Sequence, residues 1–155
     1  MVVGIGEFKV GWDADDLLVT HALGSCIAVC VWDEGARVAG LLHFLLPESR
    51  INAERAATQP AAFADTGIPL LIQAARQAGL DKRRTQVRLV GGAETTGGGG
   101  FEIGKRNLLA ARAALWRAGL LVTGESVGGT TPRTVMLRAD DGRLQIRSSD
   151  AIEEL

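Results

Sequence analysis

Residues 26–47 read CIAVCVWDEGARVAGLLHFLLP, and this stretch decides the fold. Two apolar runs flank a short polar segment, residues 33–36, whose Glu-Gly pair is typical of a turn between strands. Pro47 ends the second run, because proline has no backbone N–H to give to a strand ladder. The stretch therefore predicts an antiparallel β-hairpin.

Further strands are expected on both sides of this hairpin. Their apolar and β-branched residues predict strands at residues 3–8, 17–23, 86–93, 120–126, 133–138 and 143–147. The last two are expected to pair through the ADDG turn at residues 139–142. Residues 49–60 are polar and irregular, and we expect a loop there.

Two segments carry apolar residues at helical spacing. The first helix is expected to begin at a cap formed by Asp65 or Thr66, with Pro69 in its first turn. The second is expected to run from Ile103 to Ala118. A glycine follows each helix and supplies its stop. Two helices beside mostly antiparallel strands indicate an α+β fold.

The composition excludes several classes of protein. A chain of 155 residues with 46% hydrophobic residues has the size of a single domain, residues 1–155. The formal charge of -1 offers no net field to attract nucleic acid or an anionic membrane. No apolar run approaches the roughly 18 residues of a membrane span, and the first residues lack a signal pattern, so we expect a cytoplasmic protein. Two cysteines, Cys26 and Cys30, are too sparse for a disulfide framework and wrong for a four-ligand zinc site.

The hairpin brings a cysteine and a histidine together. If Trp32 and Arg37 close the turn, Cys26 is the cross-strand partner of His43. Directly opposed residues have Cβ atoms about 4.5 to 5.5 Å apart, near enough for a thiol to reach an imidazole. The inference depends on register, because a shift by one residue would move His43 to the other face.

This pair has the chemistry of a nucleophile and its base. A histidine can take the proton of a thiol whose ordinary pKa is about 8.5 and hold the thiolate as an ion pair. Amides of the Gly24-Ser25 turn are candidates to stabilise an oxyanion. Thr20 is the first candidate hydroxyl to orient the imidazole, with Ser25 as the second.

The alternative is a purely structural role for both residues. Buried cysteines are mostly packing residues, so Cys26 and His43 could simply belong to the core. Cys30 is expected in the core, because four residues along a strand is roughly 13 Å, too far for a disulfide with Cys26. His21 would point away from Thr20 and is the weaker candidate base.

Two glycine-rich stretches carry weaker signals. GGAETTGGGGFEIGKRN, residues 91–107, lacks the order of a phosphate-binding loop, and we expect a flexible loop across the site or a partner surface. VGGTTPR at residues 127–133 is either a simple connection or a functional loop. The basic residues of the second helix have no interleaved aromatic side chains, which argues against nucleic-acid binding.

Several motifs occur in an order that resembles one family. They are TxxLGSCIAV at residues 20–29, the histidine of GLLHFLLP, GGA at 91–93, IGKRN at 103–107 and VGG at 127–129. Each alone is common, but the ordered set spans nearly the whole chain and resembles the chemoreceptor glutamine deamidase family, CheD.

The resemblance implies a cysteine hydrolase that converts glutamine side chains on the cytoplasmic helical bundles of chemoreceptors to glutamate and releases ammonia. It implies a catalytic site of Cys26, His43 and Thr20, and no metal or organic cofactor. The implied fold is a layered α/β sandwich of mixed and antiparallel sheets with two main helices, related to deamidating bacterial toxins.

Two other functions remain open at this point. Family members can bind a CheC-type phosphatase, so the chain could be a non-catalytic adaptor for that partner. The same thiol chemistry could instead hydrolyse glutamate methyl esters on the receptors. The chain departs from the family pattern at Pro132, where glycine is common, and in the run from Gly97 to Gly100. Both departures bear on recognition of the receptor or of a partner.

Overall fold

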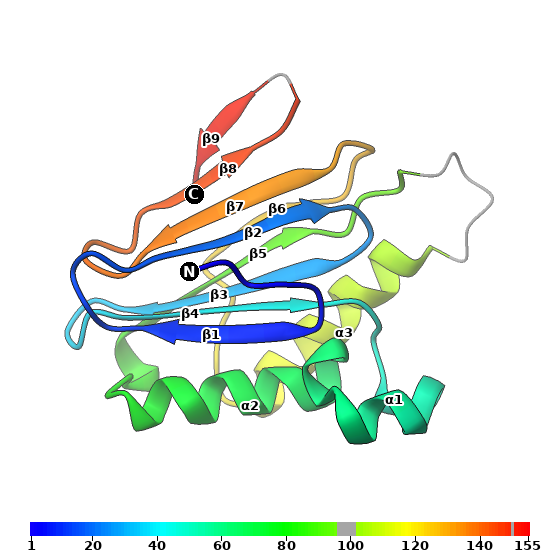
Figure 1. The fold of residues 1–155 in the computed structure, drawn as a ribbon, viewed down its shortest axis with the longest axis horizontal. Coiled ribbons are helices and arrows are strands. Elements are labelled where there is room, and N and C mark those ends of the chain that lie inside the picture. Colours follow the sequence, from blue (N-terminus) through cyan, green and yellow to red (C-terminus); the bar gives the residue numbers. More distant parts are fainter. Residues whose placement is uncertain (96–101, 150) are drawn as a thin grey trace.

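The computed structural model describes residues 1–95, 102–149 and 151–155. The described chain forms three layers, with helices against a five-stranded sheet and a four-stranded sheet on the other side (Figure 1). The strand orders are β1-β4-β3-β5-β6 and β2-β7-β8-β9. Strands β5 and β6 are parallel and their sheet is therefore mixed, while the second sheet is antiparallel. The predicted α+β sandwich is confirmed.

The described strands are β1 (Glu7–Gly11), β2 (Leu17–Leu23), β3 (Ile27–Asp33), β4 (Val38–Phe44), β5 (Thr85–Gly91), β6 (Gly124–Val127), β7 (Arg133–Arg138), β8 (Leu144–Arg147) and β9 (Ile152–Glu154). The α-helices are α1 (Ala53–Thr58), α2 (Ala64–Gln77) and α3 (Ile103–Arg117). Short 3-10 helices are η1 (Ser49–Asn52), η2 (Pro60–Ala62) and η3 (Lys82–Arg84).

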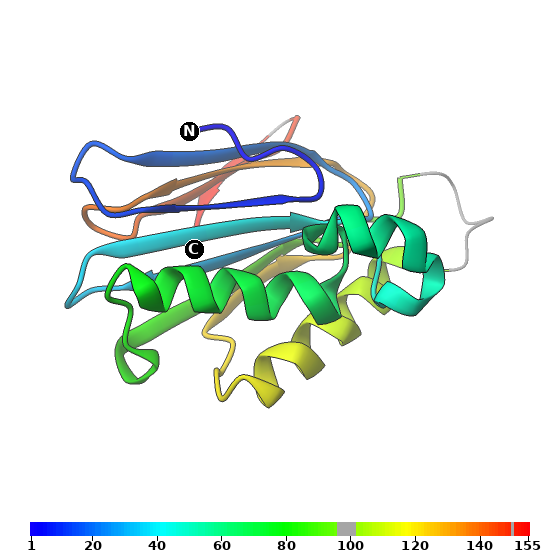
Figure 2. The same cartoon turned by 60° about the horizontal axis from the view of Figure 1, so that its bottom comes forward.

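Strands β3 and β4 are buried along their whole length, and their alternating side chains serve two cores. Ile27, Val29 and Val31 pack toward the helices. Ala28 and Cys30 pack toward the second sheet. Figure 2 shows α2 and α3 lying across one face of the middle sheet, opposite the second sheet. The hairpin therefore belongs to the middle layer, and neither of its faces is exposed to solvent.

The register of this hairpin differs from the predicted one. The pair closest to the turn is Asp33 and Val38, so Ala28, not Cys26, lies opposite His43. The Asp33 carboxylate accepts hydrogen bonds from turn amides, and Arg37 has a φ of 53°, which removes it from the strand. The register moves by two residues, so every side chain keeps its predicted face. Cys26 therefore lies diagonally to His43, one position beyond the last paired residues of the ladder.

Other local predictions were wrong for identifiable reasons. Residues 49–60 form η1 and α1 and begin η2, and the Asn52 side chain caps α1 by accepting from Arg55 N. The residue that caps α2 is Phe63, without a side-chain hydrogen bond. Asp65 is not a cap because its carboxylate accepts from the Ser49 amide and hydroxyl, and the Thr66 hydroxyl donates to Pro60 O. Pro69 lies inside α2 rather than in its first turn.

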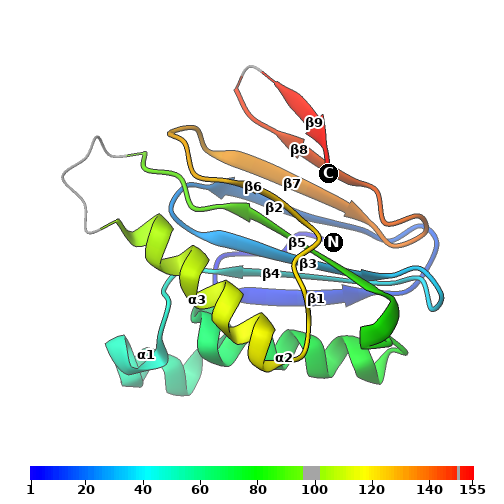
Figure 3. The ribbon, with the colours of Figure 1, turned by 180° about the vertical axis from the view of Figure 1, so that it is seen from behind.

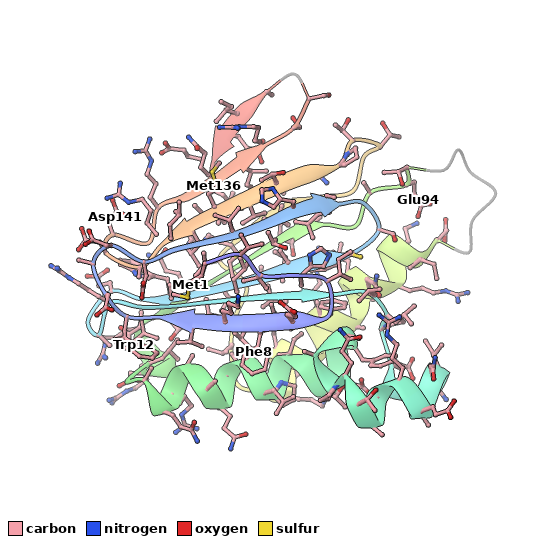
Figure 4. The ribbon with its side chains drawn as sticks, in the orientation of Figure 1. Met1, Phe8, Trp12, Glu94, Met136 and Asp141 are labelled. Atoms are coloured by element: carbon pink, nitrogen blue, oxygen red, sulfur yellow. The ribbon has the colours of Figure 1, made fainter. Side chains whose placement is uncertain are left out.

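The strands and α3 meet at one end of the molecule. Strand β4 ends there and β3 begins there, β5 ends there, and α3 starts there (Figure 3). Glu94 marks this end in Figure 4, while Trp12 and Asp141 mark the opposite end. Cys26 lies at this end, directly before β3.

Candidate active site

His43 lies in the layer between the two sheets, and none of its side chain reaches solvent. Its partner is Thr20 on β2, whose Oγ1 lies 2.7 Å from His43 Nδ1. Thr20 is also fully buried, and the register of β2 shifts between Thr20 and Leu23, so both of these residues point inward although they are three positions apart. Of the two hydroxyl candidates named from the sequence, Thr20 first and Ser25 second, Thr20 makes this contact.

The Thr20 hydroxyl fixes which nitrogen of His43 carries a proton. Thr20 Oγ1 donates its single proton to the carbonyl of Val3 at 2.7 Å. It must therefore accept from His43, so Nδ1 is protonated in the neutral imidazole and Nε2 is a free base. The Val3 carbonyl, which no sequence signal indicates, thus sets the tautomer of the candidate base.

His43 Nε2 is buried and has no hydrogen-bond partner among the described residues. A buried nitrogen with an unused lone pair is uncommon, and such atoms call for an explanation. Burial lowers the pKa of His43 to about 4, because the cationic form loses its hydration. At neutral pH the ring is therefore an uncharged base with a free lone pair on Nε2.

Cys26 is half-buried and packs on the core between the sheets. Burial raises the pKa of the Cys26 thiol, and two smaller effects oppose it. The thiol faces its own backbone N–H, and the guanidinium of Arg55 on α1 acts on it through charge. The Arg55 Nε atom donates to Gln59 Oε1 at 3.1 Å, which holds this cation in place.

The raised pKa of Cys26 and the lowered pKa of His43 both favour uncharged side chains before substrate binds. Burial favours the uncharged forms of both the thiol and the imidazole, so the thiolate–imidazolium ion pair predicted from the sequence is not the favoured resting form. Proton transfer from sulfur to Nε2 would then accompany attack on a substrate, as in general-base catalysis. Cys26 is partly exposed, whereas His43 is fully buried.

Of the two amides predicted to stabilise an oxyanion, that of Gly24 is already bonded within the turn. The Gly24 N–H donates to Ala22 O at 3.0 Å, so it is not free to bind an oxyanion. The carbonyls of Gly24 and Cys26 accept from the amides of Ala93 and Gly92, at 2.8 and 2.9 Å. The segment before β3 is therefore held along the end of β5.

Glycines explain how β5 can approach so closely. Gly91 has a φ of +117°, and a Cβ at this position would collide with the carbonyl oxygen of Cys26. The GGA motif at residues 91–93, which was predicted to open a flexible loop, instead holds the segment that leads to Cys26. The run from Gly97 to Gly100 lies outside the described residues.

Asn107 on α3 was missed as an individual site residue. It is fully buried, and its Nδ2 donates to Ser25 O at 3.0 Å and to Leu45 O at 2.8 Å. In the sequence, the IGKRN motif at residues 103–107 was informative only as part of a family resemblance. The sequence did offer one indication of its role. Asn107 interrupts the apolar stripe on the buried face of an amphipathic helix, where a polar side chain needs hydrogen-bond partners.

Other candidate residues lie apart from this site. Cys30 is fully buried, which raises the pKa of its thiol to about 12, and its predicted core position is confirmed. His21 is exposed, opposite in direction to the buried Thr20, as predicted. Pro132 lies in the connection before β7. Within the described residues, no cluster of three or more His, Cys, Asp or Glu side chains suits a metal ion.

No helix in the described part of the chain is long and apolar enough to cross a membrane. The arrangement of a half-exposed thiol, a buried imidazole with a free Nε2 and a hydroxyl on Nδ1 is suited to nucleophilic hydrolysis of an acyl group. A substrate must bring its carbonyl carbon to the protein surface, where Cys26 lies.

Comparison with known proteins gives one consistent result. A family model described as CheD chemotactic sensory transduction matches residues 45–148. The chain is 42% identical over its whole length to a probable chemoreceptor glutamine deamidase CheD from Solibacter usitatus, covering 92% of that protein. It is 45% identical to the protein named CheD 2 from Anaeromyxobacter dehalogenans, with 100% of this chain and 98% of the relative aligned. A third relative, CheD 1 of Syntrophus aciditrophicus, is 41% identical over 96% of this chain and 94% of its own.

Proposed function

Since the chain belongs to the CheD family, we propose that it hydrolyses the side-chain amide of glutamine residues in chemoreceptors, leaving glutamate and releasing ammonia. The observation that carries the proposal is the buried, unpartnered Nε2 of His43, held as a free base by Thr20 on the same side of the hairpin as the partly exposed thiol of Cys26. The activity contributes to adaptation in chemotaxis.

We assign the nucleophile to Cys26 and the base to His43. The thiol proton moves to His43 Nε2 as sulfur attacks the carboxamide carbon, which forms a C–S bond and a tetrahedral oxyanion. The imidazolium then gives this proton to the amide nitrogen, the C–N bond breaks, and ammonia leaves. A thioester between the substrate and Cys26 remains.

Water completes the reaction through the same groups. His43 Nε2 takes a proton from water as the water oxygen attacks the thioester carbon. The C–S bond breaks, the proton returns to sulfur, and the product is a glutamate carboxyl group. We assign the oxyanion-stabilising role to the N–H of Cys26, which already faces the sulfur, and a supporting role to Gly24 and Ser25.

Thr20 is a positioning residue in this scheme. Its hydroxyl accepts from Nδ1 and stabilises the imidazolium that forms on proton transfer. A neutral hydroxyl stabilises this cation less than a carboxylate would, which suits a base that only needs to hold the proton between attack and ammonia release.

The substrate we propose is the cytoplasmic helical bundle of a chemoreceptor, and the site of action is the cytoplasm. A glutamine on the surface of a helix has a flexible side chain that can reach a half-exposed thiol without unfolding of either protein. A CheC-type phosphatase is a second proposed partner, which rests on the family resemblance alone. If Cys26→Ala leaves binding to that phosphatase and the chemotactic output unchanged, the adaptor role is the main one.

Ammonia release tests the proposed reaction. A recombinant cytoplasmic receptor fragment is incubated with the protein, and free ammonia and methanol are both measured. We expect ammonia from the unmodified fragment and none after its candidate glutamines are replaced by glutamate. Methanol from a methylated fragment, without ammonia from the unmodified one, would overturn deamidation in favour of methyl-ester hydrolysis.

A further inference from the structure

The pairing between β3 and β4 ends one residue before it would reach Cys26, the candidate nucleophile. The last paired residues of β3 and β4 are Ile27 and Phe44. Cys26 and Leu45 would form the next pair, but they lie outside the ladder. On its other side, Cys26 O accepts from Gly92 N in continuation of the pairing between β3 and β5, and Leu45 N donates to Ala62 O at 2.9 Å.

Two carbonyls near this open end need a donor from elsewhere. Ser25 O and Leu45 O are both acceptors, so they cannot bond to each other. The amide nitrogen of Asn107 carries two hydrogens and reaches both, at 3.0 and 2.8 Å. Its orientation is unambiguous, because only the NH2 group, and not the oxygen, can face two carbonyls.

We propose that Asn107 is a positioning residue that sets the approach of the Cys26 thiol to His43 Nε2. One of its bonds holds the residue directly before Cys26, and the other holds the chain two residues after His43. A single side chain thus links the segment before Cys26 to the segment after His43, just beyond the end of the β3–β4 ladder. The inference concerns the same catalytic pair as the proposed function and rests on that assignment.

The rest of α3 is built to bring Asn107 to this position. Gly104 lies three residues earlier on the same face of the helix, and a Cβ there would lie only 2.5 Å from Gly92 O. Glycine at this position lets the first turn of α3 rest against the segment that braces Cys26. Asn107 follows one turn later and enters the site fully buried. In the IGKRN motif, Gly104 thus lets α3 lie close to Gly92, and Asn107 binds the carbonyls of Ser25 and Leu45.

One polar atom of Asn107 is left without a partner, and this unfavourable feature supports a functional role over simple packing. Asn107 Oδ1 is buried and has no partner among the described residues. An unsatisfied buried acceptor destabilises a fold, so its retention points to geometry that the site requires. His43 Nε2 has no hydrogen-bond partner among the described residues, Cys26 included, so the positions of the two backbones control whether sulfur and Nε2 can meet.

The test uses two variants of Asn107 and one matched control. Asn107→Asp keeps the shape but loses the NH2 donor, and Asn107→Ser shortens the side chain. Ala111→Gly is the control, since it weakens α3 one turn away at another buried position. Thermal unfolding, the rate of Cys26 alkylation by iodoacetamide against pH, and the kcat and KM of deamidation are measured for each folded variant.

We expect both Asn107 variants to lose about 10²-fold in kcat with KM within about threefold, because misplacement by an ångström is enough for such a loss. Their alkylation profiles should match that of His43→Ala, whereas Ala111→Gly should keep the wild-type profile at an equal loss of Tm. A wild-type profile and kcat in a folded Asn107 variant would overturn the proposal, as would failure of both variants to fold.

Failure of the proposed function gives a different result. In that case the wild type releases no ammonia, but the alkylation profiles still report whether Asn107 couples the thiol to His43. A shifted profile in Asn107→Asp with no deamidation by the wild type would support the positioning role and contradict only the choice of substrate.

Discussion

The Thr20 hydroxyl lies 2.7 Å from His43 Nδ1 and donates its proton elsewhere, to the Val3 carbonyl, so His43 keeps Nε2 free as a base. This relationship joins three segments of the chain: the residues before β1, the middle of β2 and the end of β4. A proton acceptor for the Cys26 thiol therefore depends on the packing of one sheet on the other.

Removing the Thr20 hydroxyl should slow the enzyme without abolishing it. Thr20→Val keeps the shape but leaves His43 Nδ1 and the Val3 carbonyl without their shared partner. We expect a loss of about 10-fold to 10²-fold in kcat, because the residue orients the base and does not react. Steady-state deamidation kinetics measure it, with Thr20→Ser as the control that retains the hydroxyl. Equal kcat for Thr20→Val and wild type would remove Thr20 from the site.

Protonation of His43 should determine how both the deamidation activity and the folding stability fall at acidic pH. Burial places the pKa of His43 at about 4, against 6.5 in an unfolded chain. Activity should therefore persist below pH 6 and fall only near pH 4, since the base works in its neutral form.

The same shift has a defined effect on folding. Between pH 6.5 and about 4 the unfolded chain binds a proton that the folded chain excludes, so stability falls as pH falls through this window. Thermal unfolding should show a steeper loss for wild type than for His43→Gln over this range. Parallel curves, or an activity midpoint near 6.5, would contradict a buried neutral imidazole.

Arg55 should assist ionisation of the nucleophile. Its guanidinium lowers the pKa of the Cys26 thiol through charge, against the larger effect of burial. Arg55→Gln should slow alkylation of Cys26 at neutral pH by about threefold, and added salt should reduce the difference between the two proteins. Arg50→Gln is the matched control, because Arg50 is exposed and pairs with Glu48. The same alkylation rate in Arg55→Gln and wild type at low salt would exclude this effect.

The two cysteines should differ sharply in reactivity. Cys30 is fully buried, with a pKa of about 12, whereas Cys26 is half-buried. Native protein should take up one iodoacetamide, at Cys26, and denatured protein two. Peptide mapping identifies the labelled residue, and Cys30→Ala should keep the deamidation activity. Labelling of Cys30 in the native state would show that the core between the sheets opens on the timescale of the reaction.

The sequence was a good guide to the elements and to the faces of the strands. Helix α3 was expected at residues 103–118 and occupies Ile103–Arg117, because an apolar stripe and a following glycine mark it clearly. Cys26 and His43 were expected on one face, and strand alternation keeps them there even though the register is two residues away from the predicted one.

What the sequence could not indicate depends on contacts between distant segments. The turn register depended on Asp33 accepting turn amides and on the left-handed backbone of Arg37, which a count of turn residues does not include. Asn107 lies 82 residues from Ser25 and 62 from Leu45, so no local pattern connects them. The Val3 carbonyl belongs to the backbone and leaves no side-chain signal at all. The reactive side chains of the site could be predicted from their residue types, whereas the hydrogen bonds between distant segments that position them could not.

The most direct test of the central claim is peptide-mapping mass spectrometry of a chemoreceptor cytoplasmic fragment after incubation with wild-type protein or with Cys26→Ala. We predict a gain of about one mass unit at each converted glutamine with the wild type, and no gain with the variant, whose fold is checked by thermal unfolding. Equal conversion by a folded Cys26→Ala variant, or no conversion by the wild type, would contradict a Cys26-dependent glutamine deamidase.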